Sequence, residues 1–154
     1  MVLRFARRRA RRGGALRRQM AHVAAGIVCI AADTRRILFL RRSPRVKKSG
    51  LWSCPAGRLD PGEVPLEAAI REFAEEAGYS GPYTIVEHFM DPARRFHHFV
   101  AVSPTEFAPR LNWESDASGW FCVSQPPRPL HPGIVPMLGH LRSRGTMPVG
   151  ARLR

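Results

Sequence analysis

The segment from Pro65 to Ala77 constrains the fold most, because it carries the clearest helical pattern in the chain. Its apolar residues recur at helical spacing and would form one face of a helix: Leu66, Ala69, Ile70, Phe73 and Ala77. Pro65 suits the first helical turn, and Gly78 suits the left-handed residue that ends a helix. We therefore predict a helix over residues 65–77 whose apolar face packs against a core.

Strand-like segments flank this helix on both sides. Apolar, β-branched runs occupy residues 23–32 and 37–40 before it, and residues 83–90, 95–102 and 119–123 after it. A last short helix is indicated by Ile134, Met137, Leu138 and Leu141. This order predicts an α+β fold, an α/β/α sandwich in which a mixed β-sheet carries the helix 65–77 and a C-terminal helix.

The basic residues are distributed unevenly along the 154-residue chain, whose formal net charge is +13. Eight arginines fall within the first 18 residues, and no acidic residue precedes Asp33. Such a run cannot pack, so we expect residues 1–19 to be a disordered extension that is dispensable for folding. Residues 20–145 would form the folded domain, and residues 146–154 a tail. The arginine run fits an RNA-binding arm or a targeting peptide. A third interpretation is that translation begins at Met20, so that the run is not part of the protein.

Several classes of protein are disfavoured by composition. No apolar run approaches the roughly 20 residues that a transmembrane helix needs. The arginines near the N-terminus are not followed by the apolar stretch of a secretory signal. The three cysteines form no CxxC pair and no disulfide framework. We expect a cytoplasmic protein without a membrane partner.

The predicted helix also carries three acidic residues, Glu72, Glu75 and Glu76, at positions i, i+3 and i+4. They fall within an arc of about 100°, away from the face of Leu66, Ile70 and Phe73. A solvated acidic face is the simpler interpretation of such a cluster taken alone. A cationic neighbourhood favours a functional one, and the candidates are Arg41, Arg42, Arg45, Lys47, Lys48 and Arg58. Oxygen ligands favour Mg²⁺ or Mn²⁺, and a metal site ringed by arginines suits a phosphoanhydride.

The stretch from Gly57 to Tyr79 resembles the Nudix box, GX5EX7REUXEEXGU, in which U is a bulky apolar residue. Every fixed position matches at the required spacing: Gly57, Glu63, Arg71, Glu72, Glu75, Glu76 and Gly78. Upstream, LWSCPAG is similar to the family's entry into the box, with Ala56 in place of a glycine. Downstream, Glu114 lies six residues before Trp120, as in the E-H-x4-W segment of many members, with Ser115 in place of the histidine.

The resemblance implies a Mg²⁺-dependent hydrolase that cuts a diphosphate linkage in a nucleoside-diphosphate-type small molecule, with Mn²⁺ able to substitute. It implies that Glu72, Glu75 and Glu76 ligate the metal together with the carbonyl oxygen of Gly57. The sequence thus predicts a metal centre where the glycine-rich loop meets the helix.

Further roles follow from the same resemblance. Arg71 would orient Glu72 or Glu63 through a salt bridge, and Glu63 would support the site at its edge. Glu75 and Glu114 are the two candidates for the general base. Val64 replaces the usual Ser or Thr cap, at an expected cost to stability of about 1 kcal/mol.

Residues for substrate recognition are less sharply indicated. Arg41, Arg42 and Arg58 are candidates for the phosphates, and Trp52 for stacking on a base, although core packing is the alternative for Trp52. Phe96 and Trp113 are further stacking candidates. His97 and His98, adjacent on a strand, would point to opposite faces of the sheet and cannot both bind one metal.

Three functions remain open from the sequence. The first is the small-molecule hydrolase. The second is an RNA 5′-end pyrophosphohydrolase or decapping-type enzyme guided by the arginine run. The third is a catalytically silent nucleotide-binding module, which the complete set of glutamates disfavours. The sequence specifies neither the nucleotide substrate nor the oligomeric state.

Overall fold

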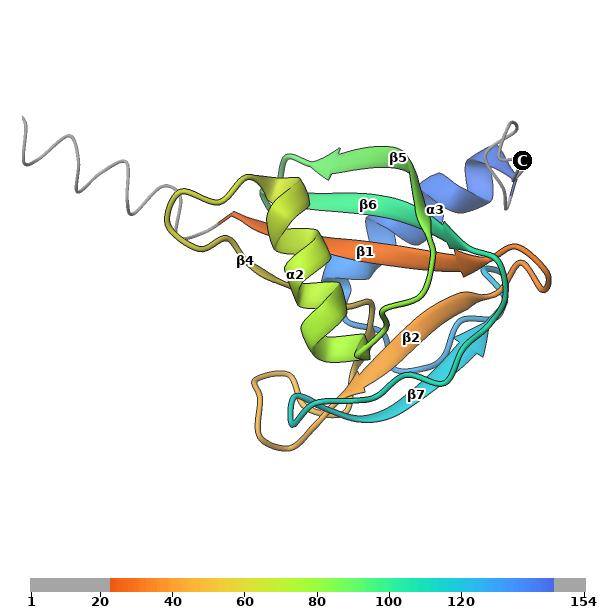
Figure 1. Ribbon diagram of the computed structural model, residues 1–154, viewed down its shortest axis with the longest axis horizontal. Helices are drawn as coiled ribbons and strands as arrows, with labels where there is room; N and C mark the ends of the chain where they lie inside the picture. The colour runs from red at the N-terminus through yellow and green to blue at the C-terminus, as the bar shows by residue number, and fades with distance from the viewer. Residues whose placement is uncertain (1–22, 146–154) are drawn as a thin grey trace, which may run out of the picture.

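The computed structural model describes residues 23–145, so the predicted extension 1–19 and tail 146–154 lie outside the described residues. The elements in chain order are β1 (Ala24–Ala31), β2 (Ile37–Arg42), β3 (Trp52–Ser53), β4 (Ala56–Arg58), α2 (Pro65–Ala77), β5 (Thr84–Asp91), β6 (Phe96–Ser103), β7 (Ser115–Phe121), the 3₁₀ turn η1 (Pro132–Ile134) and α3 (Val135–Arg144). Figure 1 shows the sheet with α2 in front of it and α3 behind it.

The strands form one mixed sheet in the order β3-β2-β1-β6-β5, with β4 paired to β1 and β7 paired to β2. The strands β1 and β6 are parallel, and the other pairs are antiparallel. A helix on each face of this sheet confirms the predicted α+β sandwich. No helix within residues 23–145 has both the length and the apolar character needed to cross a membrane.

Two apolar cores lie on opposite faces of the sheet. The core under α2 includes Ala25, Ile27, Leu38, Leu40, Ala68, Ala69, Phe73 and Ala77. The core under α3 includes Val28, Ile30, Ile37, Phe39, Val100, Ile134, Met137, Leu138 and Leu141. Alternate residues of β1 and β2 therefore serve different cores, because successive side chains of a strand point to opposite faces.

Both ends of α2 form as predicted. Pro65 occupies the first turn, and the Glu67 carboxylate accepts a hydrogen bond of 3.1 Å from the backbone N–H of Val64. Gly78 adopts the left-handed conformation at φ 58°, and its N–H donates to the carbonyl of Ala74 at 3.1 Å. Glu67 thus forms one half of a capping box. The other half would need a side-chain acceptor at position 64, which Val64 lacks.

The face that α2 buries agrees with the prediction in part, because Ala69, Phe73 and Ala77 are buried. Leu66 and Ile70 are 38% and 41% exposed, whereas Glu72 and Glu76 are only 9% and 6% exposed. The prediction that the carboxylates stand away from the buried face was therefore wrong for these two. The reason is that the helix packs against β4 as well as β1. The backbone of β4 donates a hydrogen bond to Glu76, and Arg71 donates one to Glu72, so both carboxylates can be buried.

Candidate active site

The short strand β4 brings backbone into direct contact with the acidic side of α2. A Cβ atom added to Gly57 would overlap the carboxylate of Glu72, so only glycine permits this approach. One residue earlier, the backbone N–H of Ala56 donates to Oε1 of Glu76 at 3.0 Å. The sheet therefore positions both buried carboxylates through backbone atoms, which cannot change rotamer.

Burial leaves these two carboxylates with an electrostatic cost. Desolvation raises the pKa of Glu72, and it raises the pKa of Glu76 to about 8. The negative charge of Glu114 contributes to both increases. Glu114 thus acts electrostatically on both buried carboxylates, and its membership of the site stays a prediction.

The loop that carries Glu114 is tied to the basic loop after β2. The backbone N–H of Ser43 donates to the carbonyl of Glu114 at 2.8 Å, and the Ser43 hydroxyl donates to the carbonyl of Trp113 at 2.8 Å. The Glu114 N–H in turn donates to the side chain of Asn112. These bonds hold the main chain at Glu114 in place, while its carboxylate accepts no hydrogen bond within the described residues.

Arg71 links the acidic groups of the site. Its guanidinium donates to both oxygens of Glu63, at 2.9 and 3.0 Å, and to Oε1 of Glu72 at 2.7 Å. It also donates to the carbonyl of Arg58 at 3.0 Å. The bonds to Arg71 hold the pKa of Glu63 below its ordinary value. The sequence left open whether Arg71 contacts Glu72 or Glu63, and in the structure it contacts both.

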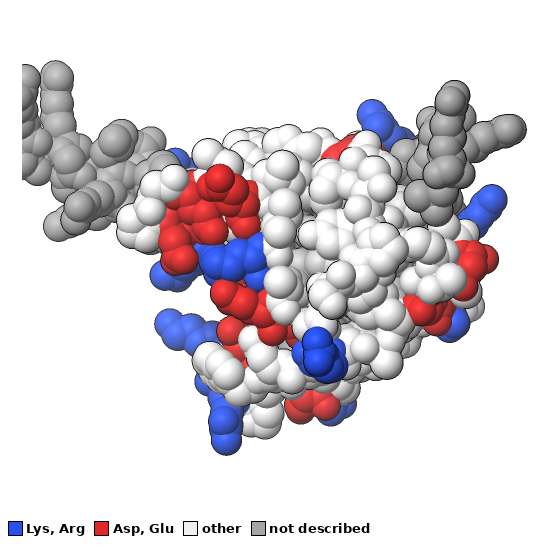
Figure 2. Space-filling view, in the orientation of Figure 1, with Lys and Arg blue, Asp and Glu red and all other residues white. Residues whose placement is uncertain are grey.

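Glu75 lies at the solvent edge of this group. Its side chain is 53% exposed and approaches Nη1 of Arg71 at 3.5 Å. Acidic side chains gather over α2 and the loop before it, with a cationic group among them (Figure 2). Of the three predicted ligands, Glu72 and Glu76 are thus buried together, and Glu75 flanks them from outside.

The donors of this site suit a hard divalent cation. Within residues 23–145 no three His, Cys, Asp or Glu side chains converge closely enough to hold a metal by themselves. Mg²⁺ commonly takes only one or two protein carboxylates and completes its shell with water and substrate phosphates. The buried pair Glu72 and Glu76, whose charge the protein compensates only in part, matches that requirement.

A cavity of about 380 Å³ lies beside the acidic group. Its apolar and aromatic wall includes Ala24, Gly26, Val28, Phe96 and Ile134, and its basic rim consists of Arg42, Lys47, Lys48 and Arg58. Gly57 lines this cavity and also contacts Glu72. The strand β4 is therefore the shared boundary between the cavity on the α3 side of the sheet and the carboxylates on the α2 side.

Some predicted substrate-binding residues reach this cavity and others do not. Arg42 and Arg58 line it, as does Phe96. Arg41 instead pairs with Asp116 at 2.7 Å and lies over the ring of Trp52. Trp52 packs edge-on against Phe121 in the α3 core. The structure does not bring Arg41 and Trp52 into the cavity, and packing accounts for Trp52.

Two histidines line the cavity that the sequence did not assign to it, His98 and His131. His97 and His98 point to opposite faces of the sheet, as predicted. The Nδ1 of His97 lies 2.9 Å from Nε2 of His88 on the neighbouring strand. His131 accepts a hydrogen bond from the N–H of Gly133 and thereby begins η1. The only sequence signal for His98 was its alternation with Phe96, which places both side chains on one face.

Comparison with known proteins places this geometry in context. The protein-family model described as the NUDIX domain matches residues 20–141 of this chain. An 8-oxo-dGTP diphosphatase from Proteus vulgaris is 36% identical over 58 residues, which is 37% of this chain and 49% of that protein. An RNA pyrophosphohydrolase from Erythrobacter litoralis is 41% identical over 49 residues, 32% of this chain and 30% of that protein.

The fold has close structural counterparts. The crystal structure of a Nudix hydrolase from M. smegmatis superposes with a TM-score of 0.65 at 24% identity, covering 84% of this chain and 89% of that one. The two curated relatives are matched over only about a third to a half of their own length. The structural similarity therefore extends over most of the chain, whereas the sequence similarity to these two relatives covers about a third of it.

Proposed function

The chain belongs to the Nudix family, and we propose that it is a Mg²⁺- or Mn²⁺-dependent hydrolase of a phosphoanhydride bond in a nucleoside-diphosphate-type substrate. The observation that carries the proposal is the buried pair Glu72 and Glu76, set against Gly57 and next to a cavity with a basic rim. The acidic pair, as the metal site, and the basic rim, as the surface for phosphates, would lie on the two sides of one strand.

The proposed metal ligands and the arginine that orients one of them have separate roles. Glu72 and Glu76 would hold the cation, with Glu75 and the carbonyl oxygen of Gly57 as further ligands. The cation, when bound, neutralises phosphate oxygens and acidifies a coordinated water. Arg71 fixes Glu72 through its guanidinium fork, anchored on the other side by Glu63.

The remaining charges act on the substrate and the water. Arg42, Lys47, Lys48 and Arg58 hold the phosphate groups that the cation does not reach. Glu114, whose charge acts on the buried pair, is a candidate to accept the proton of the attacking water, and Glu75 is the other. A catalytically silent module is disfavoured, because the box glutamates and their arginine are all present, and Arg71 contacts Glu63, Glu72 and Glu75.

The test is a substrate panel measured with and without Mg²⁺. Nucleoside triphosphates, nucleotide sugars, dinucleoside polyphosphates and 5′-triphosphorylated RNA are scored for phosphate or pyrophosphate release. On the best substrate, Glu75→Gln and Glu76→Gln should each lower kcat by about 10²-fold or more, the scale of losing a principal electrostatic stabiliser. Near-full activity in both variants would contradict the catalytic proposal.

An RNA 5′-end pyrophosphohydrolase is the second candidate. The basic rim of the cavity and the partial similarity to a protein named an RNA pyrophosphohydrolase support it. A protein beginning at Met20 separates the two functions. If the arginine run guides RNA, its removal should weaken RNA binding most at low salt and leave mononucleotide turnover unchanged.

A further inference from the structure

One wall of the cavity is set by the pairing of β1 with β6. The parallel register sets Ala24 beside Phe96 and Gly26 beside His98. Residues two apart on a strand share a face, so the rings of Phe96 and His98 stand together next to two small residues of β1. The rings form the wall on the β6 side, and the chain entering β4 closes the other side, where a Cβ added to Gly26 would lie 2.5 Å from Ala56.

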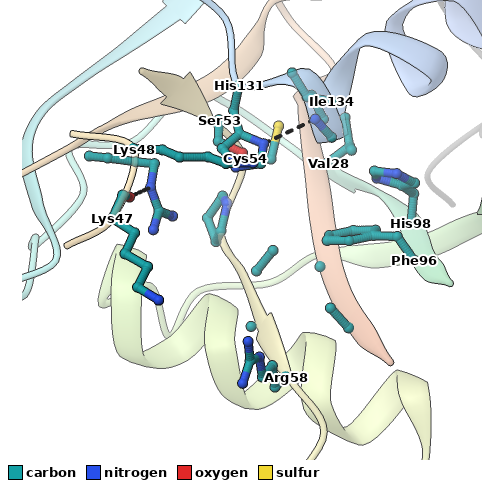
Figure 3. A pocket seen from close by; sticks show the side chains of 17 residues that line it. Val28, Lys47, Lys48, Ser53, Cys54, Arg58, Phe96, His98, His131 and Ile134 are labelled. Carbon is teal, nitrogen blue, oxygen red and sulfur yellow. Dashed lines mark hydrogen bonds between the residues drawn. The ribbon is translucent and has the colours of Figure 1, made fainter. Parts of the chain in front are cut away.

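The two rings lie next to each other in this wall. The ring centroids of Phe96 and His98 lie 4.2 Å apart with an angle of 33° between their planes. Figure 3 shows both side chains on one side of the cavity, with Lys47 and Lys48 on the other side. An aromatic face opposite cations suits a ligand that joins a flat ring to negatively charged groups.

One atom in this wall lacks a partner. His98 is only 2% exposed, and its Nε2 is buried without a hydrogen-bond partner among the described residues. A buried polar atom left unpaired costs free energy, and native proteins seldom retain one without a reason. At the wall of a cavity, a polar group of the ligand can supply the missing bond.

The imidazole of His98 can form a hydrogen bond with either an acceptor or a donor of a ligand. Burial lowers the pKa of His98 to about 4, with partial opposition from the charge of Asp91, so the ring is neutral at neutral pH. A neutral imidazole has one donor and one acceptor nitrogen. Since no described protein group fixes its tautomer, Nε2 can donate to a carbonyl or accept from an amino group.

We propose that His98 is a specificity-determining residue, whose Nε2 forms a hydrogen bond with the edge of a nucleotide base stacked against Phe96. The phosphates of that nucleotide lie toward Arg42, Lys47, Lys48 and Arg58, and from there toward Gly57 and the acidic pair. The assignment of a nucleotide as the ligand rests on the proposed function. The cavity volume of about 380 Å³ falls within the range of small-molecule sites.

The experiment measures binding without turnover, so that it can fail or succeed independently of the hydrolase proposal. AMP, GMP, CMP and UMP are titrated into the protein in EDTA, with ribose 5-phosphate as the probe that lacks a base. In wild type, the best of the four nucleotides should shift the imidazole ¹⁵N resonances of His98, and ribose 5-phosphate should leave them in place.

Variants of His98 and Phe96 distinguish hydrogen bonding to the edge of the base from stacking on its face. His98→Phe, which keeps a ring but no nitrogen, should weaken the tightest nucleotide by about tenfold, bring the four Kd values together and spare ribose 5-phosphate. His98→Asn, which retains a donor and an acceptor, should keep part of the discrimination. Phe96→Leu should instead weaken all four nucleotides alike, because stacking does not distinguish base edges.

Two outcomes would overturn the assignment. One is a His98→Phe protein whose four Kd values keep their wild-type ratios. The other is a set of wild-type His98 resonances that stay unchanged at saturating nucleotide, a result that does not depend on how well a variant folds. Base-dependent binding by a protein inactive on the whole substrate panel would refute hydrolysis and leave this inference standing.

Discussion

Gly57 on β4 lies so close to the carboxylate of Glu72 on α2 that a methyl group at position 57 would overlap it. Gly57 also lines the cavity, so one residue without a side chain separates the ligand space from the buried glutamate. The requirement for glycine comes from this contact. A backbone φ in the left-handed region is not the reason, because Gly57 is not among the glycines with positive φ.

Gly57→Ala should therefore damage the site more than the fold. We expect kcat to fall by about 10²-fold, because displacement of a site group by about 1 Å can cost that much. The loss of unfolding free energy should stay near the 1–3 kcal/mol typical of overpacking. The matched control is Gly139→Ala in α3, where an added Cβ meets nothing within 4 Å and kcat should be unchanged. Wild-type kcat in Gly57→Ala would show that the Glu72 contact is irrelevant to turnover.

Arg71→Lys keeps the positive charge and removes the guanidinium fork. A lysine can satisfy Glu63 or Glu72 and not both with the same geometry, so we expect kcat to fall by at least about tenfold. The control is Arg36→Lys, which breaks a similar fork to Glu106 at 2.7 and 3.0 Å. That variant should lose less than about 1 kcal/mol of stability and keep its kcat, because the pair is partly exposed. Equal kcat losses in both would assign the effect to general destabilisation.

Glu114→Gln tests whether this carboxylate belongs to the site. If it accepts a proton or shapes the metal's surroundings, kcat should drop by about 10²-fold while the melting temperature stays near that of wild type. Glu106→Gln provides the contrast, since Glu106 pairs with Arg36 and lies among residues without a proposed catalytic role. Unchanged turnover in Glu114→Gln would leave Glu75 as the candidate base.

Two histidines and one glutamate should act with opposite signs on the pH dependence of stability. Burial lowers the pKa values of His98 and His131 from 6.5 to about 4 each. Between pH 6.5 and 4 the unfolded chain binds protons at these two sites that the folded protein does not, so the two histidines lower the free energy of unfolding as pH falls. Burial raises the pKa of Glu76 to about 8, and this group acts in the opposite direction. We expect each histidine to contribute a loss of about 1–2 kcal/mol between pH 7 and pH 5, measured by urea denaturation as the difference between wild type and a variant that lacks it.

Two variants apportion the contribution of the histidines. His98→Phe should lose less stability between pH 7 and pH 5 than wild type does, because it lacks one of the two groups. His131→Asn lacks the other and retains a side-chain acceptor for the N–H of Gly133. Variants whose stability changes between the two pH values by the same amount as that of wild type would contradict the shifts.

The sequence specified α2 well because its signals are local. Pro65, Gly78 and the glutamate spacing all lie within one segment, and a helix turns such spacing into geometry directly. The same logic succeeded for Ala69, Phe73 and Ala77 and failed for the rest of the buried face. Periodicity counted Leu66 and Ile70 as core, whereas the structure buries Glu72 and Glu76, because the position of β4 decides which side of the helix is covered.

The cavity could not be predicted from the sequence, for a different reason. Its wall depends on β1 and β6 being parallel neighbours in a particular register, and nothing local in either strand indicates that pairing. Phe96 could be named as a stacking candidate from its type alone. His98 could not, since its significance comes from the buried and unpaired Nε2, which only the packing produces.

The pairing of β1 with β6 also has a consequence for how the protein reaches its native state. Ala24 begins the sheet and meets Phe96 only after β2, β3, β4, α2 and β5 have intervened along the chain. Pairing of this kind must close a long loop before it gains stabilising contacts, which slows folding. During synthesis the chain can therefore complete the acidic helix well before it can form a ligand cavity, so nucleotide protection in a refolding assay should appear late.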